Sequence, residues 1–144
     1  MDTSRIIEFI GNHYLLCGVF LALLVVLAIT EIRRGGRSIG SAQLTSLLNS
    51  DQAIIVDIRS SKDFGAGHIT DSVNIPFDKF TSRVVELNKY KENKVIVIVD
   101  SQGQQSGPIC RDMKKSGFNV AKLGGGIANW KADGLPLVKK KAKA

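Results

Sequence analysis

Cysteine and histidine are scarce in this sequence, which restricts the chemistry that depends on them. Among 144 residues the cysteines are Cys17 and Cys110, and the histidines are His13 and His68. Two cysteines make no disulfide framework, and one of them lies in an apolar segment, so we expect reduced thiols and a reducing compartment. Metal ligands cluster at short spacings, whereas the histidines are far apart and the cysteines are not clustered. We therefore expect no disulfide, no metal site and no cofactor.

Charged residues are missing from residues 14–30, YLLCGVFLALLVVLAIT. As a helix rising about 1.5 Å per residue, this segment covers roughly 26 Å, close to the bilayer's hydrocarbon thickness of about 30 Å. A buried core helix would carry a polar stripe, and this segment has none. A cleaved signal peptide would begin with a positive region, yet Asp2 and Glu8 oppose Arg5. We expect an uncleaved transmembrane helix over 14–30, whose apolar part could start near residue 6.

Positive charge exceeds negative charge by seven, and most of the excess lies in two short segments. The linker at residues 31–37 holds three arginines, and the tail at 138–144 holds four lysines. Removing these seven from the 20 Lys and Arg leaves 13, which the 13 Asp and Glu balance. This distribution argues against nucleic-acid binding. Basic segments beside a membrane attract anionic lipid by about 1 kcal/mol per residue, and the tail could equally be a solubilising end.

The arginines beside the apolar segment predict its orientation. Arg33, Arg34 and Arg37 follow the segment closely, whereas Arg5 alone precedes it. Basic residues stay on the cytoplasmic side of a span. We therefore expect residues 1–13 outside the cytoplasm and the remaining chain inside it.

From residue 37 onward, apolar runs alternate with helical patterns. We expect Ser41 to cap the first helix, and Phe80, Val84 and Leu87 to form the buried side of the third. Strands that alternate with helices are typical of a parallel α/β sheet with helices on both faces. The predicted strands cover 37–39, 53–57, 72–75, 95–99 and 119–123, and the predicted helices cover 41–49, 62–66, 77–90 and 106–116.

Two of these strands lead into an aspartate. AIIVD ends at Asp57, and VIVIVD ends at Asp100, ahead of a short Gly-containing loop and a predicted helix. In parallel sheets ligands bind beyond the carboxyl ends of the strands, and a helix N-terminus favours anions. We therefore expect both aspartates to lie at the functional edge of the sheet.

Several motifs, in the right order, resemble the rhodanese-homology domain. Residues 56–76, VDIRSSKDFGAGHITDSVNIP, are similar to the family's Asp-x-Arg, Gly-His-Ile and Asn-Ile-Pro motifs. Residues 123–130, LGGGIANW, are similar to its closing Leu-x-Gly-Gly-x-x-x-Trp, and GLP follows at 134–136. The resemblance spans about residues 38–137 and implies a doubly wound α/β fold around a five-stranded parallel sheet. A single span before one such domain resembles the membrane-tethered rhodanese-like proteins of bacterial inner membranes.

The resemblance also implies sulfur transfer, in which a cysteine after the fourth strand carries a sulfane sulfur as a persulfide. Asp100 falls on that cysteine's position, while Gly103 and Ser106 match the family's loop. A carboxylate cannot hold a sulfane sulfur, and Gln105 stands where arginine is common, so an anionic substrate meets no positive charge. The related phosphatases also need a cysteine. We predict no catalytic residue and no small anion at an inactive loop made of Asp100, Ser101, Gln102, Gly103, Gln104, Gln105 and Ser106.

Three interpretations of Asp100 remain open. Its carboxylate could accept loop N–H groups in a self-filled anion site, contact a partner, or act as nucleophile or base in another reaction. Cys110 is the only candidate sulfur carrier in the domain and lies one turn into the following helix, although a free helical cysteine is more often a small buried residue.

The remaining motif residues are expected to be structural. We expect Arg59, beside Asp57, to anchor loops at the sheet's edge, and His68 to have no catalytic task. Residues 124–126 lack the Lys-Ser/Thr of a phosphate-binding loop and predict a turn with positive φ. Trp130 is expected to cover the core.

The leading prediction is a membrane-anchored, catalytically inactive rhodanese-like domain that serves as a binding or regulatory module at the cytoplasmic face. Its partner would be a protein, which could itself lie in the inner membrane. One alternative is a divergent sulfurtransferase that uses Cys110. The other is a membrane-protein assembly factor acting through the span, where Gly18, Ala22 and Ala28 form a weak small-residue face. The predicted segments are 1–13 outside the cytoplasm, a span at 14–30, a linker at 31–37, the domain at 38–137 and the tail at 138–144.

Overall fold

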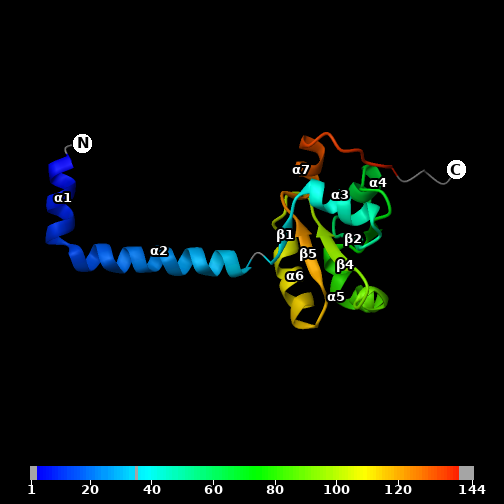
Figure 1. The fold of residues 1–144 in the computed structure, drawn as a ribbon, viewed down its shortest axis with the longest axis horizontal. Coiled ribbons are helices and arrows are strands. Elements are labelled where there is room, and N and C mark those ends of the chain that lie inside the picture. Colours follow the sequence, from blue (N-terminus) through cyan, green and yellow to red (C-terminus); the bar gives the residue numbers. More distant parts are fainter. Residues whose placement is uncertain (1–2, 35, 140–144) are drawn as a thin grey trace. The chain divides into compact units, whose positions relative to one another are not determined.

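A computed structural model describes residues 3–34 and 36–139. The chain divides into two compact units, Met1–Arg34 and Gly35–Ala144. The first unit is helical, and the second is an α/β domain (Figure 1).

The first unit consists of α1 (Thr3–Asn12) and α2 (Tyr14–Arg34), which meet at a sharp bend (Figure 1). Within residues 3–34 and 36–139 no single helix is long and apolar enough to cross a membrane; α1 and Tyr14–Thr30 meet that test only together, as a pair bent by 93°. The apolar part that was expected to start near residue 6 is therefore divided between two helices. The poor helix formers Gly11 and Asn12 precede the break, and α2 continues into the predicted linker.

The second unit is built on one parallel sheet in the order β1-β5-β4-β2-β3. Its central strands β2 and β4 are apolar and β-branched, as suits strands that are covered on both faces. This confirms the predicted five-stranded parallel α/β fold. The strands are β1 (Ser38–Ile39), β2 (Ala53–Asp57), β3 (Val73–Asn74), β4 (Val95–Val99) and β5 (Val120–Leu123).

Helices cover both faces of the sheet. Side chains alternate between the two faces along each strand, so an apolar strand presents apolar side chains to both faces, and both need to be covered. Ile96 and Ile98 of β4 belong to one core cluster, together with residues of α6 and of the segment before β4. Val97 and Val99 belong to the other, together with residues of α3 and α7. The helices of this unit are α3 (Ser41–Asn49), α4 (Ser61–Ala66), α5 (Phe80–Arg83), α6 (Ser106–Lys115) and α7 (Gly126–Ala132).

Two local predictions were wrong. The expected helix over 77–90 is divided into the 3-10 helix η1 (Phe77–Lys79), α5, and the 3-10 helix η2 (Val84–Tyr90). Its neighbouring β-branched valines, Val84 and Val85, disfavour a continuous α-helix. Ser41 is not a cap either, because Gly40 holds the N-cap position and the buried Ser41 hydroxyl has no hydrogen-bond partner in the described part of the chain. Phe80 and Leu87 are nevertheless buried, as expected, and Val84 is partly buried.

Candidate functional site

The carboxyl ends of β2 and β4 bring two aspartates to the same edge of the sheet. Asp57 is the last residue of β2 and pairs with Val99, directly before Asp100. Both aspartates are buried, with 1% of their surface exposed. Their carboxylates have different partners, so they form two adjacent polar clusters rather than one acid–base pair.

Asp100 is held by the loop that follows it. Its carboxylate accepts hydrogen bonds from the backbone N–H groups of Gly103, Gln105 (2.6 Å) and Ser106 (2.9 Å). Hydrogen bonds to a charged group contribute about 1.5–3 kcal/mol each, enough to offset the burial of a carboxylate. Gln105 and Ser106 lie where α6 begins, and a helix N-terminus favours negative charge. The geometry is a self-filled anion site, the first of the three interpretations of Asp100.

The other loop residues lie around this carboxylate. Ser106 is completely buried, and its hydroxyl has no partner among the residues that the structure describes. Gly103 is half-buried and has a positive φ of 85°, a conformation that favours glycine. The exposed members of the loop are Ser101, Gln102, Gln104 and Gln105.

The start of α7 closes the site from the other side. The N–H of Ile127 donates to the Asp100 carbonyl at 2.9 Å, and the N–H of Ala128 donates to the Ser101 carbonyl at 3.0 Å. Gly126 has φ +59°, and a Cβ there would lie 2.8 Å from Asp100 Oδ1. The predicted glycine turn is therefore real at Gly125 and Gly126, and the glycines also allow the close approach of α7 to the loop.

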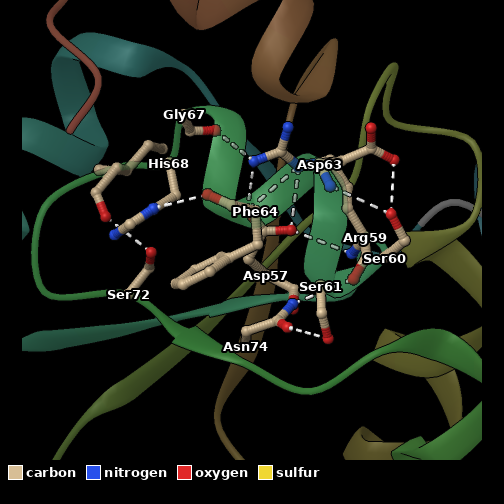
Figure 2. Close-up of polar contacts among 11 residues, drawn as sticks. Asp57, Arg59, Ser60, Ser61, Asp63, Phe64, Gly67, His68, Ser72 and Asn74 are labelled. Atoms are coloured by element: carbon tan, nitrogen blue, oxygen red, sulfur yellow. Dashed lines mark hydrogen bonds and ion pairs between the residues drawn. The ribbon is translucent and has the colours of Figure 1, made fainter. Parts of the chain in front are cut away.

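Asp57 and Arg59 form the second cluster (Figure 2). The Arg59 guanidinium donates to both Asp57 carboxylate oxygens, with Nη2 2.7 Å from Oδ2, and also to the Gly67 carbonyl at 2.7 Å. The amide of Asn74 donates to the carbonyls of Asp57 and Arg59, both at 3.0 Å. Arg59 thus ties the end of β2 to the end of α4, which is the anchoring role expected from the sequence.

His68 is fixed by its surroundings. Its ring stacks on Phe64 with centroids 3.8 Å apart, and Nδ1 lies 2.7 Å from the Phe64 carbonyl. Its backbone forms an antiparallel bridge with Val138. These contacts give His68 a packing role. Likewise, Trp130 is buried in the core and donates its indole N–H to the Pro136 carbonyl at 3.0 Å.

Cys110 is poorly placed for sulfur chemistry. It is 1% exposed and packs in the core cluster beneath α6. Burial raises the pKa of its thiol to about 12, an effect that the nearby Lys122 partly opposes. Because the thiolate is the reactive form, the thiol is inert near neutral pH.

One group of cations was not found from the sequence. Arg59, Lys131 and Lys139 line a cleft of about 350 Å³ together with Asp63. These residues are far apart in the chain and meet only because the segment after α7 returns to α4, so no short motif could reveal them. Within residues 3–34 and 36–139, no three His, Cys, Asp or Glu side chains are grouped closely enough to hold a metal ion.

The fold and these motifs agree with the comparison to known families. The Rhodanese-like domain family matches residues 41–133. The chain therefore belongs to the rhodanese-like domain family.

Three known proteins illustrate the similarity. Over 143 residues the chain is 35% identical to the uncharacterized protein YibN of Escherichia coli (strain K12), covering 96% of this chain and 99% of that protein. It is 32% identical to a tRNA uridine(34) hydroxylase of Buchnera aphidicola (strain Tuc7), covering 72% of this chain and 34% of the hydroxylase. A thiosulfate sulfurtransferase of Pseudomonas aeruginosa shares the fold, with a TM-score of 0.68 and 20% identity over 79% of this chain and 22% of that enzyme.

The contact between α7 and the Asp100 loop predicts different costs for two glycine substitutions. Gly126→Ala should destabilise the protein by more than about 2 kcal/mol, because positive φ costs about 1–2 kcal/mol and the new methyl group also meets the Asp100 backbone. Gly134→Ala is the matched control: its φ is +72°, but nothing lies within 4 Å of the added carbon. Urea unfolding followed by Trp130 fluorescence measures both. Equal losses would show that the close approach is unimportant.

The burial of Cys110 predicts its reactivity. In a Cys17→Ser background at pH 8, a thiol reagent should label the unfolded protein far faster than the folded one, since a pKa of about 12 leaves roughly one thiol in 10,000 ionised. The free energy of unfolding should also fall as the pH rises from about 9 toward 12, because the unfolded thiol ionises first. A Cys110→Ala variant should lack this decrease. Rapid labelling of the folded protein would contradict the assignment.

Proposed function

We propose that this protein is a membrane-anchored rhodanese-like module that binds a partner instead of transferring sulfur. The observation that carries the proposal is the self-filled loop. Asp100 stands where the family resemblance expects the sulfur-carrying cysteine, and its buried carboxylate occupies three N–H groups of the anion-binding loop. A carboxylate forms no persulfide, and its negative charge opposes the entry of a second anion.

Cys110 does not replace the missing nucleophile. Its thiol is buried and protonated near neutral pH. Uptake of a sulfane sulfur would need this side chain to leave the core beneath α6. The sulfurtransferase alternative therefore has no exposed thiolate in the domain to support it.

The membrane anchor in this proposal is α2. Its large apolar side chains are exposed on all sides, from Leu15 at 70% to Leu27 at 61%. Such a surface is unfavourable in water, at about 25 cal/mol per Å², and is typical of a helix in lipid. The arginines after residue 32 would keep the α/β domain on the cytoplasmic side of the bacterial inner membrane, with the N-terminus outside.

A binding role requires an available surface, and the domain offers an apolar cleft of about 520 Å³ between α6 and the segment 77–91. Phe77 and Val85, at its border, are 50% and 67% exposed. Exposed aromatic and aliphatic side chains around a cleft are typical of protein-binding sites. We assign the partner to the class of proteins that would insert apolar side chains here, and this class includes other inner-membrane proteins.

The loss of catalysis is tested by restoring the cysteine. The unmodified protein should neither turn over thiosulfate and cyanide nor gain mass from thiosulfate. Asp100→Cys should gain about 32 Da, one sulfur, because its thiolate would attack the outer sulfur of thiosulfate, break the S–S bond and release sulfite. The loop N–H groups that now bind the carboxylate would stabilise that thiolate. Cys110→Ser in the Asp100→Cys background controls for the Cys110 thiol, Cys17→Ser in the same background controls for the Cys17 thiol, and both variants should gain the same mass.

Two results would contradict this account. Turnover by the unmodified protein that disappears in Cys110→Ser would make it an active sulfurtransferase. Failure of a folded Asp100→Cys variant to take up sulfur would show that the loop is no longer an intact site.

The anchor is tested by membrane fractionation. After a carbonate wash the full chain should stay in the membrane pellet, because burial of a mostly apolar helix outweighs the loss of surface contacts. A chain that begins at residue 36 should be released. Release of the full chain would refute the anchor while leaving the interpretation of the loop unaffected.

A further inference from the structure

Helix α1 has one apolar face that is exposed. Ile6, Ile7, Phe9 and Ile10 are 49%, 68%, 60% and 48% exposed. Their spacings of three and four residues place them on the same side of the helix. Together they form a continuous apolar strip along α1, which we call the α1 strip.

The opposite side of α1 is polar and carries both signs of charge. Arg5 and Glu8 are three residues apart, and Asn12 follows Glu8 by four, so these side chains share a face. All three are exposed. Helix α1 is therefore amphipathic, whereas α2 is apolar around its whole circumference up to Thr30.

The bend between the helices separates these two kinds of surface. Straight, the segment 3–30 would be about 42 Å long, well beyond a hydrocarbon thickness of about 30 Å, and would place the charges of α1 in line with the span. The 93° bend at His13 avoids this conflict (Figure 1). His13 lies at the bend and keeps a hydrogen bond to each helix: its N–H donates to the Phe9 carbonyl and its carbonyl accepts from the Cys17 N–H, both at 3.0 Å. Its ring also contacts the Phe9 ring, with centroids 5.0 Å apart.

We propose that α1 lies flat in the boundary between lipid headgroups and acyl chains, with the α1 strip buried in lipid. This rests on the proposed anchoring by α2: a span close to the membrane normal puts a helix bent by 93° in the membrane plane. The interface accepts an amphipathic helix of this type, whereas the hydrocarbon core disfavours Arg5 and Glu8. Helix α1 then fixes how deeply the span sits, on the side opposite the α/β domain.

Cysteine labelling in vesicles tests this arrangement. In a Cys17→Ser background, the full chain carries one new cysteine on the α1 strip (Ile6→Cys or Ile10→Cys) or on the polar face (Ser4→Cys or Asn12→Cys). The protein is reconstituted into phosphatidylethanolamine–phosphatidylglycerol vesicles, and the membrane-bound fraction is treated with an impermeant maleimide. Labelling is normalised to the same sample in SDS and corrected with the Cys17→Ser protein.

The two strip positions should label at least about tenfold more slowly than the two polar positions. Lipid burial raises the pKa of a thiol by a unit or more and so removes most of its thiolate. Each variant introduces a single cysteine into the same helix, so the labelling rates of the strip positions and the polar positions can be compared directly.

Every other pattern overturns the proposal. Slow labelling at all four positions would place α1 inside the bilayer as an extension of the span, and fast labelling at all four would place it in water. The two strip positions could label slowly at a high protein-to-lipid ratio and quickly at a low one. That result would mean that a second copy of the protein, and not lipid, covers the strip. Absence of the full chain from the vesicles after a carbonate wash would instead be a failure of the anchor itself.

Discussion

The hydrogen bonds between the Asp100 carboxylate and the loop N–H groups hold together the edge of the sheet where β4 ends. The carboxylate fixes Gly103, and through Gln105 and Ser106 it fixes the start of α6. The backbone carbonyls of Asp100 and Ser101 accept from the first turn of α7. One residue therefore joins β4, the loop and two helices. Leaving its N–H partners unsatisfied would cost about 1–3 kcal/mol each, so this edge depends on a negative group at that point.

The second carboxylate at this edge is also neutralised locally. Asp57 is paired with Arg59, and the guanidinium continues to the Gly67 carbonyl (Figure 2). Both carboxylates thus stabilise loops within the domain. The charges of both aspartates are thus held by groups of the domain itself.

The sequence predicts the α/β sheet well because its strands are short, apolar and separated by clear helical patterns. The whole of VIVIV forms β4, and AIIVD forms β2, because no polar residue interrupts either run. The position of Asp100 directly after β4 could also be predicted, because it follows the apolar run VIVIV and the number of residues from Asp100 to Ser106 can be counted in the sequence. The membrane location and the partner remain predictions that rest on composition.

Other features depend on tertiary contacts that a linear pattern does not contain. The segment 77–90 has a helical pattern, but it breaks into shorter helices at its β-branched valines. Ser41 has the side chain of a cap yet lies one residue inside α3. Gly126 leaves room for the Asp100 carboxylate, and this role becomes visible only when the start of α7 packs against the loop after β4. The sequence pattern does not predict the bend at His13, although it does contain the apolar residues of α1 at spacings of three and four.

The contacts of the last described segment bear on where the domain ends. The family pattern stops at residue 133, but the indole N–H of Trp130 bonds to Pro136, and the backbone of Val138 pairs with His68. A protein shortened to the family boundary would expose an unpaired indole in its core and free the loop that Arg59 anchors. The folding unit is therefore longer than the unit of sequence similarity: it includes residues 134–137 and also Val138, the first residue of the predicted tail.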